Sequence, residues 1–97
     1  KNLNIRKINF DINKTLTNII ELFEYYTKPR NIKIILINKL QNNNIYNDEN
    51  RFYQAMLNFI NNSINYFENI YIILKDLDNH NTIKIEILHN GTGSLNR

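Results

Sequence analysis

The sequence predicts an α/β protein, an α+β sandwich of two layers in which both helices cover one face of a mixed β-sheet. Two observations lead to this prediction. Two segments carry apolar residues at helical spacing, and short runs rich in β-branched residues alternate with them in the order β-α-β-α-β-β. A chain of 97 residues can bury one modest core, so we expect a single domain over residues 1–97.

The first strand and the first helix are expected within residues 6–28. In the run RKINFD, Ile8 and Phe10 alternate with polar neighbours, which predicts a short strand with both side chains facing inward. Asp11 stands where a helix N-cap belongs, and Pro29 should end the helix near Lys28, because the residue before a proline is biased away from helical geometry. Apolar side chains recur at helical spacing at Leu16, Ile19, Ile20 and Phe23.

Residues 31–47 are predicted to be a strand followed by a loop. The run NIKIILIN at 31–38 is short and rich in β-branched residues, whereas KLQNNNIYN at 39–47 is typical of a loop. Roughly a fifth of the residues are asparagine and nearly another fifth are isoleucine, which we attribute to codon bias. The asparagines at 42–44 are therefore interpreted as filler in a solvated loop.

The second helix and two further strands are expected after residue 47. Asp48 is a plausible N-cap for a helix over 51–67, whose inward face would carry Phe52, Ala55, Met56, Phe59, Ile60, Ser63 and Ile64. The mostly apolar run 69–77 predicts a strand, 78–81 a turn, and 82–89 a strand that alternates isoleucine with charged residues.

Composition excludes several classes of site. The net charge of +3 is dispersed and forms no basic stripe, so no nucleic-acid surface is predicted. The absence of cysteine excludes disulfides and thiolate chemistry, and His80 and His89 have no partner at metal-ligand spacing. No apolar run is long enough to span a membrane, so we expect a cytoplasmic segment without direct membrane contact, although a parent protein could be membrane-anchored.

Two polar features are candidates for function. The run HNGTG at 89–93 holds the two glycines of the chain, and is either a hairpin turn or a loop in which Gly91 and Gly93 let a ligand approach the backbone. On the second helix, Gln54, Asn58, Asn62 and Asn65 share one face. That row is either solvated surface or a set of carboxamides, which offer oxygen atoms to Mg²⁺ and N–H groups to phosphate.

The segment NDENRFYQAMLNFINNSINYF at 47–67 resembles the N-box of the ATP-binding catalytic domain of sensor histidine kinases, in the GHKL ATPase superfamily. The family pattern G-D-x-x-R-L-x-Q-V-L-x-N-L-L-x-N-A-x-K-Y/F-T matches without gaps at Asp48, Arg51, Phe52, Gln54, Leu57, Asn58, Phe59, Ile60, Asn62, Ile64 and Tyr66. HNGTG is similar to the first glycine box, D-x-G-x-G, at both glycines, and residues 9–34 look like the family's opening strand, helix and second strand.

The resemblance implies the Bergerat fold and a site for ATP and Mg²⁺. Asn62 would coordinate Mg²⁺, Asn58 would face the triphosphate, and Asn65 and Tyr66 would also contact the nucleotide. Gly91 and Gly93 would let the backbone approach it. Hydrolysing branches of the superfamily carry a glutamate at the position of Asn58, so an amide there favours phosphoryl transfer to a protein histidine.

Three departures from the family pattern concern the site. His89 stands where the family has the aspartate that accepts a hydrogen bond from adenine, and Asn65 replaces a lysine near the phosphates. The 97 residues stop before the family's ATP lid, so the resemblance covers the N-terminal part of such a domain.

The resemblance leaves two functions open. The first is the ATP-binding part of a histidine kinase in two-component signalling, whose partners are a histidine-phosphoacceptor dimerisation domain and a response-regulator receiver domain outside this chain. The second is a degenerate domain without productive ATP binding that acts as a structural or interaction module.

Overall fold

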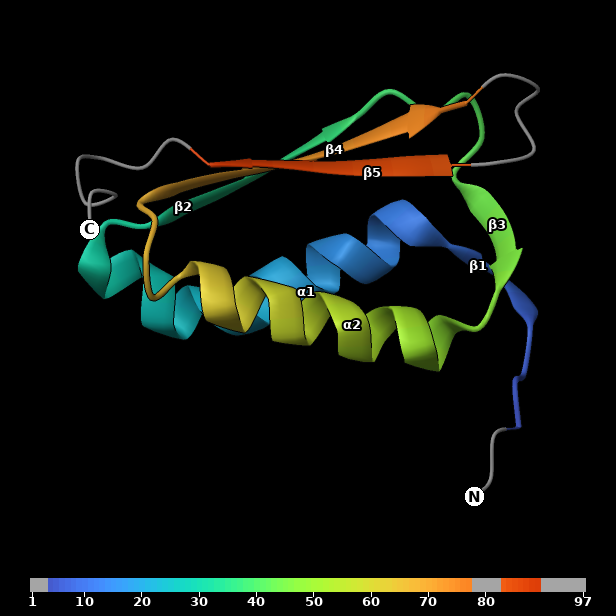
Figure 1. Ribbon diagram of the computed structural model, residues 1–97, viewed down its shortest axis with the longest axis horizontal. Coiled ribbons are helices and arrows are strands. Elements are labelled where there is room, and N and C mark those ends of the chain that lie inside the picture. The colour runs from blue at the N-terminus through green and yellow to red at the C-terminus, as the bar shows by residue number, and fades with distance from the viewer. Residues whose placement is uncertain (1–3, 78–82, 90–97) are drawn as a thin grey trace.

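The computed structural model describes residues 4–77 and 83–89, and the fold is an α+β sandwich of two layers (Figure 1). The elements in chain order are β1 (Ile8–Asp11), α1 (Ile12–Thr27), a 3-10 turn η1 (Lys28–Arg30), β2 (Lys33–Asn38), β3 (Asn44–Asn47), α2 (Glu49–Ser63), β4 (Asn69–Asp76) and β5 (Ile83–His89). The two helices lie side by side beneath the sheet formed by β2, β4 and β5. The predicted fold class is therefore confirmed.

The main sheet is mixed, with β4 at its centre. β2 runs parallel to β4, with Lys33 opposite Asn69, and β5 runs antiparallel to β4, with Ile70 opposite His89. β1 and β3 form a separate antiparallel pair in which Phe10 faces Ile45. This pair stands at the end of the sandwich where α2 begins (Figure 1).

The core lies between the helices and the lower face of the main sheet. Its fully buried side chains alternate along β4 and recur along one face of each helix: Ile12, Leu16, Ile19, Ile60, Ile70, Ile72 and Leu74. The remaining residues of the core cluster are Phe10, Phe23, Met56 and Ile64, all at most 9% exposed. Within the described residues, neither helix is long and apolar enough to cross a membrane.

Helix α1 begins and ends close to where the sequence predicts. The Asp11 carboxylate accepts a hydrogen bond from the backbone N–H of Lys14 at 3.0 Å, as expected of an N-cap. The helix ends at Thr27, before Pro29, and Asn31 then adopts a left-handed conformation with φ of 59°. Asparagine tolerates this conformation better than most residues, so it can reverse the chain into β2.

Four local predictions differ from the structure. Residues 44–47 were predicted as loop and form β3, and β1 pairs with β3 instead of joining the main sheet. Ile8, predicted to face inward, is 44% exposed: it lies on the same side of β1 as the buried Phe10, but it is the first residue of this short strand and does not belong to the core cluster. Helix α2 ends at Ser63 and not at residue 67. The predicted turn at 78–81, with His80, lies outside the described residues.

The asparagines before β3 have structural contacts and are not simple filler. The Asn38 amide donates to the side-chain oxygen atoms of Asn13 and Asn43 at 3.0 and 2.7 Å, and the Asn42 side chain accepts from the backbone N–H of Asn44 at 3.0 Å. The backbone carbonyl of Asn43 accepts from Ile12 N–H at 2.9 Å. These bonds tie the segment before β3 to the start of α1 and to the end of β2.

Candidate functional site

Asp48 fixes the start of α2, the helix that carries most of the predicted site. Its carboxylate accepts hydrogen bonds from the backbone N–H groups of Arg51 at 3.1 Å and Arg6 at 3.0 Å, and its side chain is buried. These two backbone donors, with a smaller contribution from the nearby Arg51 guanidinium, hold the pKa of Asp48 below its usual range. The N-terminal arm and α2 are thereby joined at one ionised carboxylate.

A second contact fixes α2 against α1. The Thr15 hydroxyl, on the buried face of α1, donates to a carboxylate oxygen of Glu49 at 2.8 Å. Glu49 is the first residue of α2, so both helices are held together where their N-terminal turns meet. Because Met56 and Ile60 then point into the core, the opposite face of α2 is turned to solvent.

The amides of Asn58 and Asn62 lie on this solvent-exposed face, where the sequence predicts them. They are one helical turn apart, so their Cβ atoms are about 6 Å apart. Within the described residues, neither side chain has a hydrogen-bond partner, so both keep their carbonyl oxygen atoms and N–H groups available for a ligand. Gln54, one turn before Asn58, is exposed in the same way.

Asn65 and Tyr66 lie just after the helix, in the turn at 64–66. The Asn65 amide donates to the backbone carbonyl of Asn61 at 3.3 Å, and Tyr66 is 68% exposed with its ring at a steep angle to that of Phe67. Because α2 ends at Ser63, Asn65 and Tyr66 do not continue the one-turn helical spacing of Asn58 and Asn62.

His89 is the last residue of β5, as the predicted strand over 82–89 has it, whereas residues 90–93 of the predicted glycine loop lie outside the described residues. Its imidazole stacks on Phe67, with ring centroids 3.7 Å apart and planes 13° apart, and lies near the ring of Phe59 at 6.3 Å and 22°. Three aromatic rings thus join the end of β5 to two sites far away in sequence, Phe59 in α2 and Phe67 in the segment between α2 and β4. We call His89, Phe59 and Phe67 the aromatic cluster.

The aromatic cluster adjoins the row of amides. Phe59 was predicted to face the core but is 36% exposed, because it stands at the border between the buried and the exposed faces of α2. On a helical wheel, Asn62 lies about 60° from Phe59 on the exposed side, and Ile60 lies about 100° away on the buried side. Ala55, also predicted to face inward, is exposed for the same reason.

The sequence pattern does not mark Phe59 and Phe67 as site residues. Phe59 occupies an apolar position of the N-box and has the spacing of a core residue, and Phe67 ends that segment. Their contact with His89 joins residues far apart in the chain, so the residue spacing within one segment does not predict it. Gly91 and Gly93 lie outside the described residues, so their predicted contact with a nucleotide stays a prediction.

The side-chain oxygen atoms of Asn58 and Asn62 suit a cation that is already bound to the phosphate groups of a ligand. Among residues 4–77 and 83–89, no three histidine, aspartate or glutamate side chains gather as a metal cage. Mg²⁺ carried on phosphate groups keeps several water molecules and needs few protein ligands, and amide oxygen atoms are suitable donors. Asn62 and Asn58 therefore fit this kind of cation.

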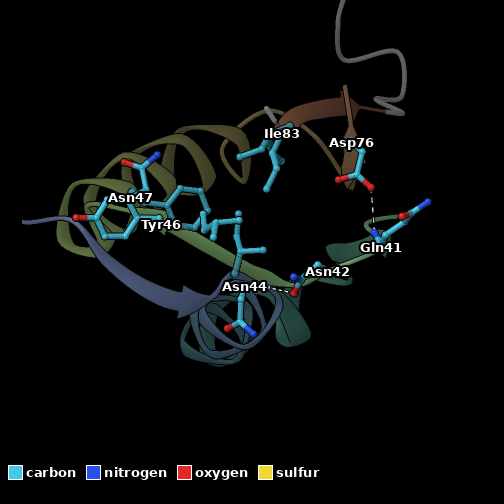
Figure 2. Close-up of a pocket in the computed structure, with 11 residues that line it drawn as sticks. Gln41, Asn42, Asn44, Tyr46, Asn47, Asp76 and Ile83 are labelled. Atoms are coloured by element: carbon cyan, nitrogen blue, oxygen red, sulfur yellow. Dashed lines mark hydrogen bonds between the residues drawn. The ribbon is translucent and has the colours of Figure 1, made fainter. Parts of the chain in front are cut away.

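A separate cavity lies at the other end of the sheet (Figure 2). It has a volume of about 570 Å³ and is lined by residues from the segment before β3, from β3 and from the ends of β4 and β5, among them Gln41, Asn42, Tyr46, Asn47, Asp76 and Ile83. Ile83 and His89 are the first and last residues of β5, which places them about 20 Å apart. The cavity contains none of the predicted site residues.

Comparison with known proteins gives structural but not sequence relatives. No protein-family model matches the sequence, and no curated protein is significantly similar to it. The catalytic domain of histidine kinase ThkA, in a nucleotide-free form, superposes with a TM-score of 0.79 at 20% identity, over 89% of this chain and 60% of that one. Full-length ShkA in complex with AMPPNP gives a TM-score of 0.71 at 23% identity, over 78% of this chain and 17% of that one.

A third structure agrees with these two. The histidine kinase AdeS of Acinetobacter baumannii superposes with a TM-score of 0.62 at 21% identity, over 75% of this chain and 37% of that one. The chain thus spans about 60% of the ThkA catalytic domain and smaller parts of the longer proteins. The resemblance read from the N-box is confirmed at the level of the fold: this chain has the fold of the catalytic domains of histidine kinases.

Proposed function

We propose that residues 1–97 are the N-terminal part of an ATP-binding domain of a sensor histidine kinase. In this proposal the domain positions Mg-ATP for phosphoryl transfer to a histidine of a separate dimerisation domain. The observation that carries the proposal is the exposed pair Asn58 and Asn62, whose side chains have no hydrogen-bond partners within the described residues. This pair lies beside the aromatic cluster, in a fold that solved histidine kinase catalytic domains share.

Each amide has a distinct part in this proposal. Asn62 would coordinate Mg²⁺ through its side-chain oxygen, and Asn58 would orient the triphosphate through its N–H groups or through water. Bound Mg²⁺ would neutralise charge on the phosphate groups. An amide cannot take a proton from water as a general base, so Asn58 favours transfer to a protein side chain over hydrolysis.

The partners follow from the same proposal. The solved complex of ThkA with the response regulator protein TrrA shows that a histidine kinase of this fold binds such a partner. We propose a response-regulator receiver domain and a histidine-phosphoacceptor domain as partners of the protein to which this chain belongs, and a cytoplasmic location for residues 1–97.

Calorimetric titration of the full-length protein with Mg-ATP tests the proposal. We expect saturable binding that Asn62→Ala weakens at least about ten-fold, because the variant loses the proposed Mg²⁺ ligand. Asn61→Ala is the matched control, since Asn61 is an exposed asparagine of the same helix outside the row and its backbone carbonyl bond to Asn65 is kept. Equal affinity in all three proteins would contradict the assignment of Asn62.

A degenerate module without productive ATP binding is the second candidate. Two observations favour it: the Asn65 amide binds back to its own helix where the family has a lysine, and the His89 ring packs on Phe67. This candidate predicts no Mg-ATP binding by the wild-type protein. If the variant His89→Asp then binds Mg-ATP, the loss is caused by the histidine.

A further inference from the structure

We propose that the site accepts 6-oxopurine as well as 6-aminopurine nucleotides, so that GTP binds about as well as ATP. This inference rests on the proposed nucleotide-binding function and adds to it how the base is held. In our interpretation the base contacts the aromatic cluster, and no charged acceptor selects adenine.

The rings of the cluster give a purine base an apolar surface of suitable chemistry. Phe59 is 36% exposed, His89 is exposed, and the described residues of the sheet and helices leave both accessible. Stacking on aromatic side chains favours nucleobases but discriminates little between them, since every base has a π face. The ring of Phe67 lies against the imidazole and keeps it in one orientation.

The polar edge of His89 does not select one purine either. Within the described residues, its ring nitrogens form no hydrogen bond that would fix the tautomer. A neutral imidazole has one N–H donor and one acceptor nitrogen, so one tautomer can accept from a 6-amino group and the other can donate to a 6-oxo group. A carboxylate in the same place would accept from the amino group and repel the oxo group.

The neighbouring amides supply the part of the site that binds phosphate. Asn62 is next to Phe59 on the exposed side of α2, and Asn58 lies one turn before Asn62. A ligand whose base touches the cluster can therefore reach both amides with its phosphate groups. No carboxylate, lysine or arginine belongs to the cluster or to the pair Asn58 and Asn62. The site therefore fits a purine nucleoside triphosphate with its own cation.

Competition calorimetry on the full-length protein with Mg-ATP, Mg-GTP and Mg-CTP tests the inference. We expect the dissociation constants of ATP and GTP to agree within about three-fold and CTP to bind more weakly, because the smaller pyrimidine has less surface to stack. In His89→Asp we expect a preference for ATP over GTP of at least about ten-fold.

Two further variants separate stacking from packing. Phe59→Leu keeps an apolar side chain without a π face and should weaken ATP and GTP binding equally, by roughly five-fold or more. Tyr25→Ala, which removes an 80% exposed ring on α1 that has no ring contact with the cluster, should leave both affinities unchanged. An unchanged affinity in Phe59→Leu would overturn the role of the cluster.

The outcomes distinguish this inference from the proposed function. If ATP binds the wild-type protein at least about ten-fold more tightly than GTP, the proposed ATP-binding function stands and the inference is overturned. If neither nucleotide binds, the proposed function itself fails and the inference fails with it.

Discussion

At the scale of single residues, the carboxylate of Asp48 makes several stabilising contacts. It caps α2, accepts the Arg6 N–H and is buried as an ion. Its lowered pKa is a property of the folded state, since the two backbone donors bind the carboxylate only there. The unfolded chain, with an aspartate pKa of about 3.9, therefore binds the proton more readily.

We therefore predict that Asp48 stabilises the fold above about pH 4 and that this contribution is lost as the pH falls through the lower pKa of the folded state. Urea denaturation of wild type and Asp48→Asn from pH 7 to pH 2.5, values chosen to bracket that window, measures it. The variant should be less stable at pH 7, because its amide group meets the Arg6 N–H, and the difference should shrink in acid.

The comparison isolates Asp48 from other acid-sensitive groups. The pKa of Glu86 is also lowered, chiefly by its hydrogen bond with Lys75 at 3.1 Å, but Glu86 is present in both proteins and cancels from the difference. A stability difference that stays constant over the whole pH range would contradict the assignment of this effect to Asp48.

At the scale of elements, α1 is stabilised by one of its faces. Leu16 is completely buried and Leu22 is 56% exposed, although both are leucines of the same helix. We predict that Leu16→Ala lowers the free energy of unfolding by about 2–5 kcal/mol, since it leaves a cavity beneath the sheet. Leu22→Ala, the matched control, should change it by less than about 0.5 kcal/mol in chemical denaturation. Similar losses in both variants would contradict the placement of α1 on the sheet.

The elements also show what local sequence can and cannot predict. Both N-caps, Asp11 and Asp48, were predicted correctly, because an N-cap acts within one turn of its own helix. β3 was not predicted, because its four residues form a strand only against β1, far away along the chain. The same reason applies to the site: Asn58 and Asn62 follow a local pattern, whereas the contact of His89 with Phe67 is long-range.

At the scale of the whole molecule, the main sheet has a protected centre and an open side. β4 pairs on both sides, whereas β5, within the described residues, pairs on one side, with β4. We predict that backbone amides of β4 exchange with deuterium most slowly, and that amides of β5 fall into two alternating classes, as expected of an edge strand. Exchange measured by NMR would resolve both classes, and uniform protection along β5 would instead indicate a further strand on its outer side.

The parallel pairing of β2 with β4 has a consequence for folding during synthesis. β2 leaves the ribosome early, but its partner follows only after β3 and the whole of α2 have been made. The nascent chain must therefore close a long loop before β2 and β4 can pair, and until then β4 does not cover the apolar face of α1. β5 emerges after β4, so His89 can meet Phe59 and Phe67 only after α2 and β4 have been made.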